Sequence, residues 1–198
     1  MASPTEIRAR SLSIASRSGL LIAASLPLLE PDLHVRRQDE VVGRLFCFHV
    51  AAAVAYGFDR AKAMAWVQQE KLGNVLTNAE VCFVQRGEGR PQEFQTQVEG
   101  MWALFWTLGF VQKLDFWKDS GDNFVTLMPN LLVGQSSSDW YRKARTRAEE
   151  ELLAACDLAY LLTVYTGRSA RPKSKANDRL LNSGHISSLS AVAHWNGF

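Results

Sequence analysis

The sequence predicts an all-α fold, a single-domain bundle of about seven or eight helices with a central pair of apolar helices. Three observations support this prediction. Apolar residues recur at helical spacing, several segments begin with helix-capping residues, and no alternating strand pattern persists long enough for a sheet. Hydrophobic residues make up 47% of the 198 residues and aromatic residues 10%, so the chain can fill a core without disulfides or metals.

The first two predicted helices differ in how much of their surface is apolar. Ser3 and Glu6 form a capping box and Pro4 suits the first helical position, so a helix begins here and is expected to end at Gly19. The segment 38–56 is apolar almost all round. A helix of that composition should be buried on most of its faces.

Capping residues and glycines place the middle helices. A helix is predicted over 60–71, and a second capping box at 77–80 begins a short one. The glycine-containing loop 87–91 separates it from an apolar helix over 92–108. This helix and the one over 38–56 form the predicted central pair.

The remaining elements are less regular. A short helix is predicted over 124–133 despite Pro129. The longest helix is predicted over 139–166, with a charged first half and an apolar second half. Residues 167–175 form a basic linker, and a final helix is expected over 185–195.

These elements give the predicted domain organisation. Residues 1–166 form a helical core domain. Residues 167–198 form the basic linker and a C-terminal helix that packs on the same domain.

Charge and cysteine content narrow the class of protein. The 22 basic and 20 acidic residues give a formal charge of +2, which excludes an obvious polyanion binder and an acidic disordered protein. The basic tail is a weak nucleic-acid signal, so nucleic acid is an unlikely partner. Cys47, Cys82 and Cys156 lie among apolar residues, which indicates thiols in a reducing compartment. No apolar stretch suits a membrane span, so we predict a cytoplasmic protein with no membrane partner.

The sequence lacks the common catalytic motifs. It contains no HExxH, GxSxG, phosphate-binding glycine loop or paired-cysteine motif, so we predict no catalytic residue, no metal and no cofactor. Arg44 and Glu99, each on an apolar helix, are predicted to form a buried ion pair. The alternative is an enzyme with an unfamiliar site around Arg44, His49 and Glu99, to which Cys47 or Tyr160 contributes.

A group of aromatic and charged residues is the candidate partner-binding surface. The charges near residue 145 could simply compensate one another on a solvated helix face. Adjacent aromatic and arginine side chains are also typical of protein interfaces. The residues predicted to bind a partner are Trp140, Tyr141, Arg142 and Arg145, together with Lys118, Asp119 and Asp122 of the polar loop.

One segment resembles a known family. Residues 99–109 fit the pattern E-x-x-W-x-L-x-W-x-L-G, which resembles the core of the bacterial family of unknown function DUF4272. Segments 25–27, 40–44, 76–80 and 147–160 resemble further family segments in the same order. The resemblance covers most of residues 7–166, whereas the C-terminal part departs from the family pattern. It implies a helical fold and no established activity or catalytic residues.

We therefore expect a non-catalytic cytoplasmic protein that binds a protein partner. One version is an immunity protein that neutralises a bacterial toxin. The enzyme described above is the alternative, and nucleic-acid binding through residues 167–198 is a third hypothesis. The sequence does not indicate an oligomeric state.

Overall fold

A computed structural model describes residues 2–23, 25–30, 35–118 and 122–169, with side chains described through residue 165 except those of 122–124. These residues contain eight α-helices and no strand, which confirms the all-α prediction. The helices are α1 (Pro4–Arg17), α2 (Gln38–Ala55), α3 (Arg60–Gln69), α4 (Asn78–Val81), α5 (Pro91–Gln95), α6 (Gln97–Thr107), α7 (Ser138–Lys143) and α8 (Glu149–Ser169). Shorter turns are the π-helix η1 (Cys82–Arg86) and the 3-10 helices η2 (Asp122–Leu127) and η3 (Leu131–Val133).

The two predicted capping boxes are present. The Ser3 hydroxyl accepts a hydrogen bond from the Glu6 backbone N–H at 3.3 Å, and the Glu6 carboxylate accepts one from the Ser3 N–H at 2.7 Å. Thr77 and Glu80 make the same exchange at 3.3 and 2.9 Å. Such local signals fix where α1 and α4 begin, because each box satisfies backbone donors that the first turn leaves unpaired.

Two predicted helices are each divided in two. The segment 92–108 forms α5 and α6, and Thr96 between them turns its hydroxyl to the Glu93 carbonyl at 3.0 Å. The segment 139–166 is interrupted after α7, because Ala144 has an extended ψ of 140° and the Arg145 N–H donates to the Leu108 carbonyl at 2.9 Å. In 124–133 two 3-10 turns replace the predicted helix, consistent with the donor that Pro129 lacks.

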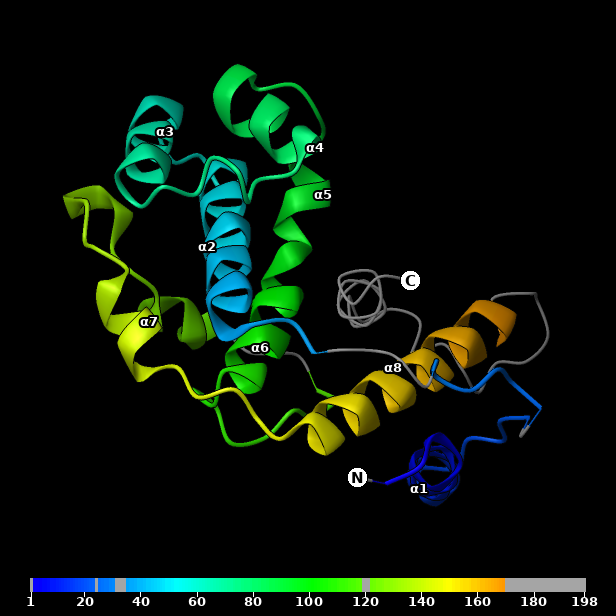
Figure 1. The fold of residues 1–198 in the computed structure, drawn as a ribbon. Coiled ribbons are helices and arrows are strands. Elements are labelled where there is room, and N and C mark those ends of the chain that lie inside the picture. The colour runs from blue at the N-terminus through cyan, green and yellow to red at the C-terminus, as the bar shows by residue number, and fades with distance from the viewer. Residues whose placement is uncertain (1, 24, 31–34, 119–121, 170–198) are drawn as a thin grey trace. The chain divides into compact units, whose positions relative to one another are not determined.

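The described chain forms two compact units. Unit 2 comprises residues 36–146 and is built around α2, which contacts α3, α5, α6 and α7 (Figure 1). Every residue of α2 from Val41 to Ala52 is buried, as its apolar composition predicts. The Phe46 ring lies 5.7 Å from the ring of Trp66 on α3 and 6.3 Å from that of Trp140 on α7, so one α2 residue connects three helices.

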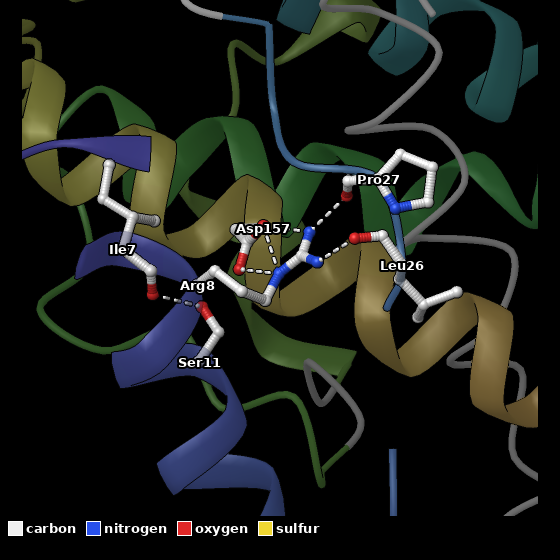
Figure 2. Close-up of polar contacts among 6 residues, drawn as sticks. All are labelled: Ile7, Arg8, Ser11, Leu26, Pro27 and Asp157. Carbon is white, nitrogen blue, oxygen red and sulfur yellow. Dashed lines mark hydrogen bonds and ion pairs between the residues drawn. The ribbon is translucent and has the colours of Figure 1, made fainter. Parts of the chain in front are cut away.

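Unit 1 comprises residues 1–35 and 147–198, and its described part is held by a buried ion pair. The Arg8 Nη2 of α1 donates to Asp157 of α8 at 2.8 Å, and Nε donates to both carboxylate oxygens at 3.1 Å (Figure 2). Nη1 donates to the Leu26 carbonyl at 2.8 Å, and Nη2 also donates to the Pro27 carbonyl at 2.6 Å. Arg8 therefore fixes both the α1–α8 contact and the loop that follows α1.

Some predictions concern residues outside this description. The final helix over 185–195 and the part of the predicted linker from residue 170 lie outside the described residues. The division of the chain near residue 166 stays a prediction. Within the described part, no helix combines the length and the apolar composition that crossing a membrane requires.

Candidate partner-binding site

The predicted aromatic residues lie on α7, half-buried against α2. The Tyr141 ring is 5.9 Å from that of Phe46, and burial raises the pKa of the Tyr141 hydroxyl. The Trp140 ring also contacts Phe46, and its Nε1–H donates to the Leu127 carbonyl at 3.1 Å. These two residues therefore hold α7 against α2 and against the segment that ends η2, while part of each side chain stays accessible.

The predicted charged residues are differently placed. Arg142 and Arg145 are exposed; Arg142 pairs with Asp139, and Arg145 donates to the Arg142 and Ala144 carbonyls at 2.9 and 2.7 Å. Lys118 is exposed. Asp119 lies outside the described residues, and only the backbone of Asp122 is described. The structure thus groups the residues on and after α7, and the partner-binding role of these residues and of the 118–122 loop stays a prediction.

The structure also exposes apolar side chains that sequence reasoning missed. Leu132 is 72% exposed and Val133 75% exposed; we call this pair the apolar tip. Leu127, whose carbonyl binds Trp140, is 51% exposed. Residues 123–138 contain no charged side chain, and that long uncharged run was the signal in the sequence. Adjacent exposed aliphatic residues of this kind are typical of interaction surfaces.

The backbone of the apolar tip is fixed by local hydrogen bonds. The Asn130 side chain accepts from the Leu132 N–H at 2.9 Å, and the Gln135 side chain accepts from the Asn130 N–H at 2.9 Å. The Gln135 N–H in turn donates to the Asn130 carbonyl at 3.1 Å. Gly134 follows η3 with a φ of +61°, a left-handed conformation that suits glycine. The tip is therefore a defined turn.

Helix α3 and the residue that follows it hold this turn by hydrogen bonds. The Trp66 Nε1–H donates to the Gln135 carbonyl at 2.8 Å, and the Gln69 amide donates to the Gly134 carbonyl at 3.1 Å. Glu70 accepts from the Ser137 N–H at 3.1 Å and from its hydroxyl. Although burial acts to raise the pKa of Glu70, hydrogen bonds from Ser137 and Gln69 hold it below its ordinary value. The two exposed aliphatic side chains are thus presented on a preorganised backbone.

A groove of about 400 Å³ lies beside the tip. Its lining is mostly apolar and includes Ala53, Phe58, Val125, Met128, Leu131 and Leu132. His49 also lines it, and His49 Nε2 is 3.0 Å from the Pro129 carbonyl. Burial lowers the pKa of His49 to about 4, so the ring is neutral near pH 7 and Nε2–H donates to that carbonyl. Among the lining residues whose side chains the structure describes, none is Asp, Glu, Lys or Arg.

The predicted buried pair of Arg44 and Glu99 was wrong, because the acidic partner of Arg44 is Glu80. Arg44 Nη1 and Nη2 donate to the two oxygens of Glu80 at 2.6 and 2.7 Å, and both side chains are buried. The Thr77 capping box orients the Glu80 carboxylate toward α2, whereas Glu99 is half-buried on α6. The Phe48 ring lies 4.1 Å from the Arg44 guanidinium carbon.

The residues of the alternative enzyme site are engaged in separate contacts. Arg44 binds Glu80, and His49 binds the Pro129 carbonyl. Burial raises the pKa of the Cys47 thiol to about 12, which leaves it protonated and a poor nucleophile. Tyr160 belongs to unit 1, where its ring faces Arg8. Among the described residues, no group of three or more His, Cys, Asp or Glu side chains is arranged to hold a metal ion.

Comparison with known proteins gives one match. The family model of DUF4272, described as a domain of unknown function, matches residues 8–187 of the 198-residue chain. No curated protein and no solved structure matches. The matched range includes the apolar tip, the groove and α7, so these features lie within the family domain.

Proposed function

The chain belongs to the DUF4272 family, a domain of unknown function, and we propose that it is a non-catalytic binding protein that recognises a partner protein through the apolar tip and the groove. The observation that carries the proposal is the rigid presentation of two adjacent aliphatic side chains that are 72% and 75% exposed. Hydrogen bonds from α3 and Asn130 already order their backbone. Little conformational entropy is therefore lost when a partner covers them.

The energy available at the tip suits an interface anchor. Burying both aliphatic side chains in an interface would contribute roughly 2–4 kcal/mol, which corresponds to a change in affinity of about 30-fold or more. The half-buried Trp140, which binds the carbonyl of the exposed Leu127, adds the kind of aromatic residue that often dominates binding energy. We therefore extend the partner-binding role predicted for α7 to residues 125–133.

The experiment is affinity capture from the native host with the full chain and two variants. We expect a stoichiometric partner to be retained by the wild type and lost with Leu132→Asp. Leu21→Asp is the matched control, because Leu21 is 91% exposed and lies in unit 1. Recovery of no stoichiometric partner, or equal recovery with both variants, would contradict the proposal.

The proposal has a narrower version, an immunity protein that acts in the bacterial cytoplasm. Its support is indirect: none of the three described cysteines forms a disulfide, as expected in a reducing compartment. A toxin-like reading frame beside the gene would be co-expressed with this chain. The wild type should restore growth and Leu132→Asp should not. Failure of both to restore growth would remove the immunity version and leave partner binding standing.

The alternative, an enzyme around Arg44, His49 and Glu99, has weaker support. Arg44 and His49 are buried and each satisfies a structural partner. A neutral His49 whose Nε2–H is already used has one ring nitrogen left for other contacts. No described contact joins these residues into one catalytic arrangement.

A further inference from the structure

We propose that the groove binds a tryptophan side chain of the partner protein, whose indole N–H donates to Nδ1 of His49. This inference rests on the proposed function and names the residue by which the partner is recognised. It follows from one hydrogen-bond acceptor that the fold leaves unused on a buried side chain lining the groove.

The imidazole of His49 offers this acceptor and has no N–H left to donate. The ring is neutral near pH 7 and so carries a single N–H. Nε2 lies 3.0 Å from the Pro129 carbonyl, which can only accept, so the N–H is at Nε2 and Nδ1 holds a lone pair. The same hydrogen bond fixes the orientation of the ring, and the acceptor is therefore preorganised.

Nδ1 is accessible from the groove. Within the part of the chain that the structure describes, no group donates a hydrogen bond to Nδ1. The only side-chain nitrogen or oxygen atom there that is both buried and without a partner is Gln97 Oε1, so Nδ1 retains accessible surface. Because His49 is only 7% exposed and lines the groove, that surface opens into the groove.

A group that fills the groove must supply a donor to this acceptor. While the groove is open, solvent can donate to Nδ1. An apolar group without an N–H or O–H would exclude that solvent and leave the lone pair unsatisfied, which weakens binding. The other polar lining residues, Thr126 and Asn130, are exposed and can stay hydrated, while the rest of the described lining is apolar. The best occupant is therefore an apolar body with one donor.

Tryptophan is the side chain that meets both requirements. Its indole N–H donates without an accompanying acceptor, and the rest of its bicyclic ring is apolar. Lysine and arginine also only donate, but their charge would lose its hydration against Phe58 and Met128. Hydroxyl and amide side chains carry an oxygen that needs a donor of its own, and the His49 N–H is already used. A groove of about 400 Å³ is in the size range of small-ligand sites, so it has room for an indole ring.

The apolar tip favours a partner side chain over a free small molecule. Leu132 lines the groove and also belongs to the tip. Val133, the other tip residue, is 75% exposed and is not among the lining residues, so a ligand confined to the groove would leave it uncovered. A protein segment that inserts a tryptophan can cover the tip with its neighbouring residues, and tryptophan is enriched at the centres of protein interfaces.

The test selects binding peptides from a displayed library of random sequences, with the full chain as target. We expect the enriched peptides to share a tryptophan. In a synthetic copy of one such peptide, benzothienylalanine replaces this tryptophan, so a sulfur atom takes the place of the N–H in a ring of the same shape. Affinity measured by fluorescence anisotropy should fall about fivefold or more, because Nδ1 is covered without a donor.

Two further measurements locate the binding at the groove. The nitrogen resonance of His49 Nδ1 should shift when the wild type binds the tryptophan peptide, and it should shift less with the analogue. Ala53→Phe fills the groove and should weaken the tryptophan peptide about tenfold or more. Ala23→Phe is the matched control, because Ala23 is exposed and lies in unit 1, and it should leave the affinity within about twofold.

The outcomes separate this inference from the proposed function. The absence of tryptophan from the enriched peptides, equal affinity of the analogue, or an unchanged His49 resonance would each overturn the inference, even if Leu132→Asp abolishes capture of the partner. The comparison of peptide and analogue uses the wild type alone, so it decides the matter if Ala53→Phe does not fold. Binding of free indole without any tryptophan peptide would overturn the inference in favour of a small ligand. If Leu132→Asp does not alter capture, the proposed function itself fails.

Discussion

The stability of this protein should depend on pH through His49, which is buried in α2 and lines the groove. Burial lowers the pKa of His49 to about 4 in the folded chain, against an ordinary value of 6.5. As the pH falls below 6.5, His49 therefore becomes protonated in the unfolded chain while it stays neutral in the folded chain. The free energy of unfolding is fully retained above pH 6.5 and decreases as the pH falls from 6.5 toward 4.

The two pKa values set the size of the effect. A shift from 6.5 to about 4 corresponds to a total loss of about 3 kcal/mol once the pH is below both values. Between pH 8 and pH 5, the same two values give a loss of about 2 kcal/mol. Carboxylates with lowered pKa values, such as Glu6 and Glu70, change the free energy of unfolding mainly below pH 4.5. The change between pH 8 and pH 5 is therefore assigned to histidine.

The assay is urea denaturation of the wild type and of His49→Gln at pH 8 and pH 5. The glutamine amide can still donate to the Pro129 carbonyl, but it does not titrate. His34, His185 and His194 are common to both proteins, so their contributions cancel in the comparison. We expect the wild type to lose about 2 kcal/mol more than the variant over this range.

Parallel pH dependence of the two proteins would refute the assignment to His49. If His49→Gln does not fold, NMR titration of the wild-type imidazole replaces the comparison. A midpoint near 4 agrees with the buried site. A midpoint near 6.5 contradicts it, because it would mean that the ring is solvated in the folded chain.

Two further predictions concern buried groups. Arg8→Met should lower the free energy of unfolding by about 3–5 kcal/mol, because it leaves the Asp157 carboxylate buried without its cation. Adding Asp157→Leu should recover much of this loss. Urea denaturation measures both variants, and a double variant less stable than the single one would contradict the reasoning. Among the thiols of the native chain, Cys82 should react with iodoacetamide first, because it is half-buried while Cys47 and Cys156 are buried. Mass spectrometry of the adducts measures the order of labelling. Early labelling of Cys47 would contradict this prediction.

Features set by neighbouring residues were predictable from the sequence. The capping boxes at Ser3 and Thr77 were recognised because all their partners lie within three residues. The burial of α2 followed equally from its composition. Such signals need no knowledge of how distant parts of the chain meet.

Features set by distant residues were not predictable. The interruption after α7 involves the Arg145 N–H and the Leu108 carbonyl. No pattern in the residues near either position predicts that contact. Arg44 was assigned to Glu99 because both lie on apolar helices. In the structure the Glu80 carboxylate binds both the Thr77 backbone N–H and the Arg44 guanidinium, a contact between residues 36 positions apart that no local pattern indicates.

The candidate site was found only in part. Sequence patterning identified Trp140 and its basic neighbours on α7, but it treated 124–133 as an ordinary helix, which would have buried one apolar face. Because two 3-10 turns form instead, Leu132 and Val133 are exposed. The uncharged run across these residues was visible, yet its exposure depends on support from α3.

The order of elements in the chain has a consequence for synthesis on the ribosome. Unit 2 is one continuous stretch, whereas unit 1 joins the first and last parts of the chain. Arg8 and Asp157 are 149 residues apart, so at about 5–20 residues per second α1 waits roughly 7–30 s for the helix that pairs with it. During this interval Ile7 and Ala15, buried in the finished protein, lack the α8 surface. Nascent chains halted before residue 157 should therefore contain a folded unit 2 beside an unprotected α1, the point at which chaperones or proteases gain access.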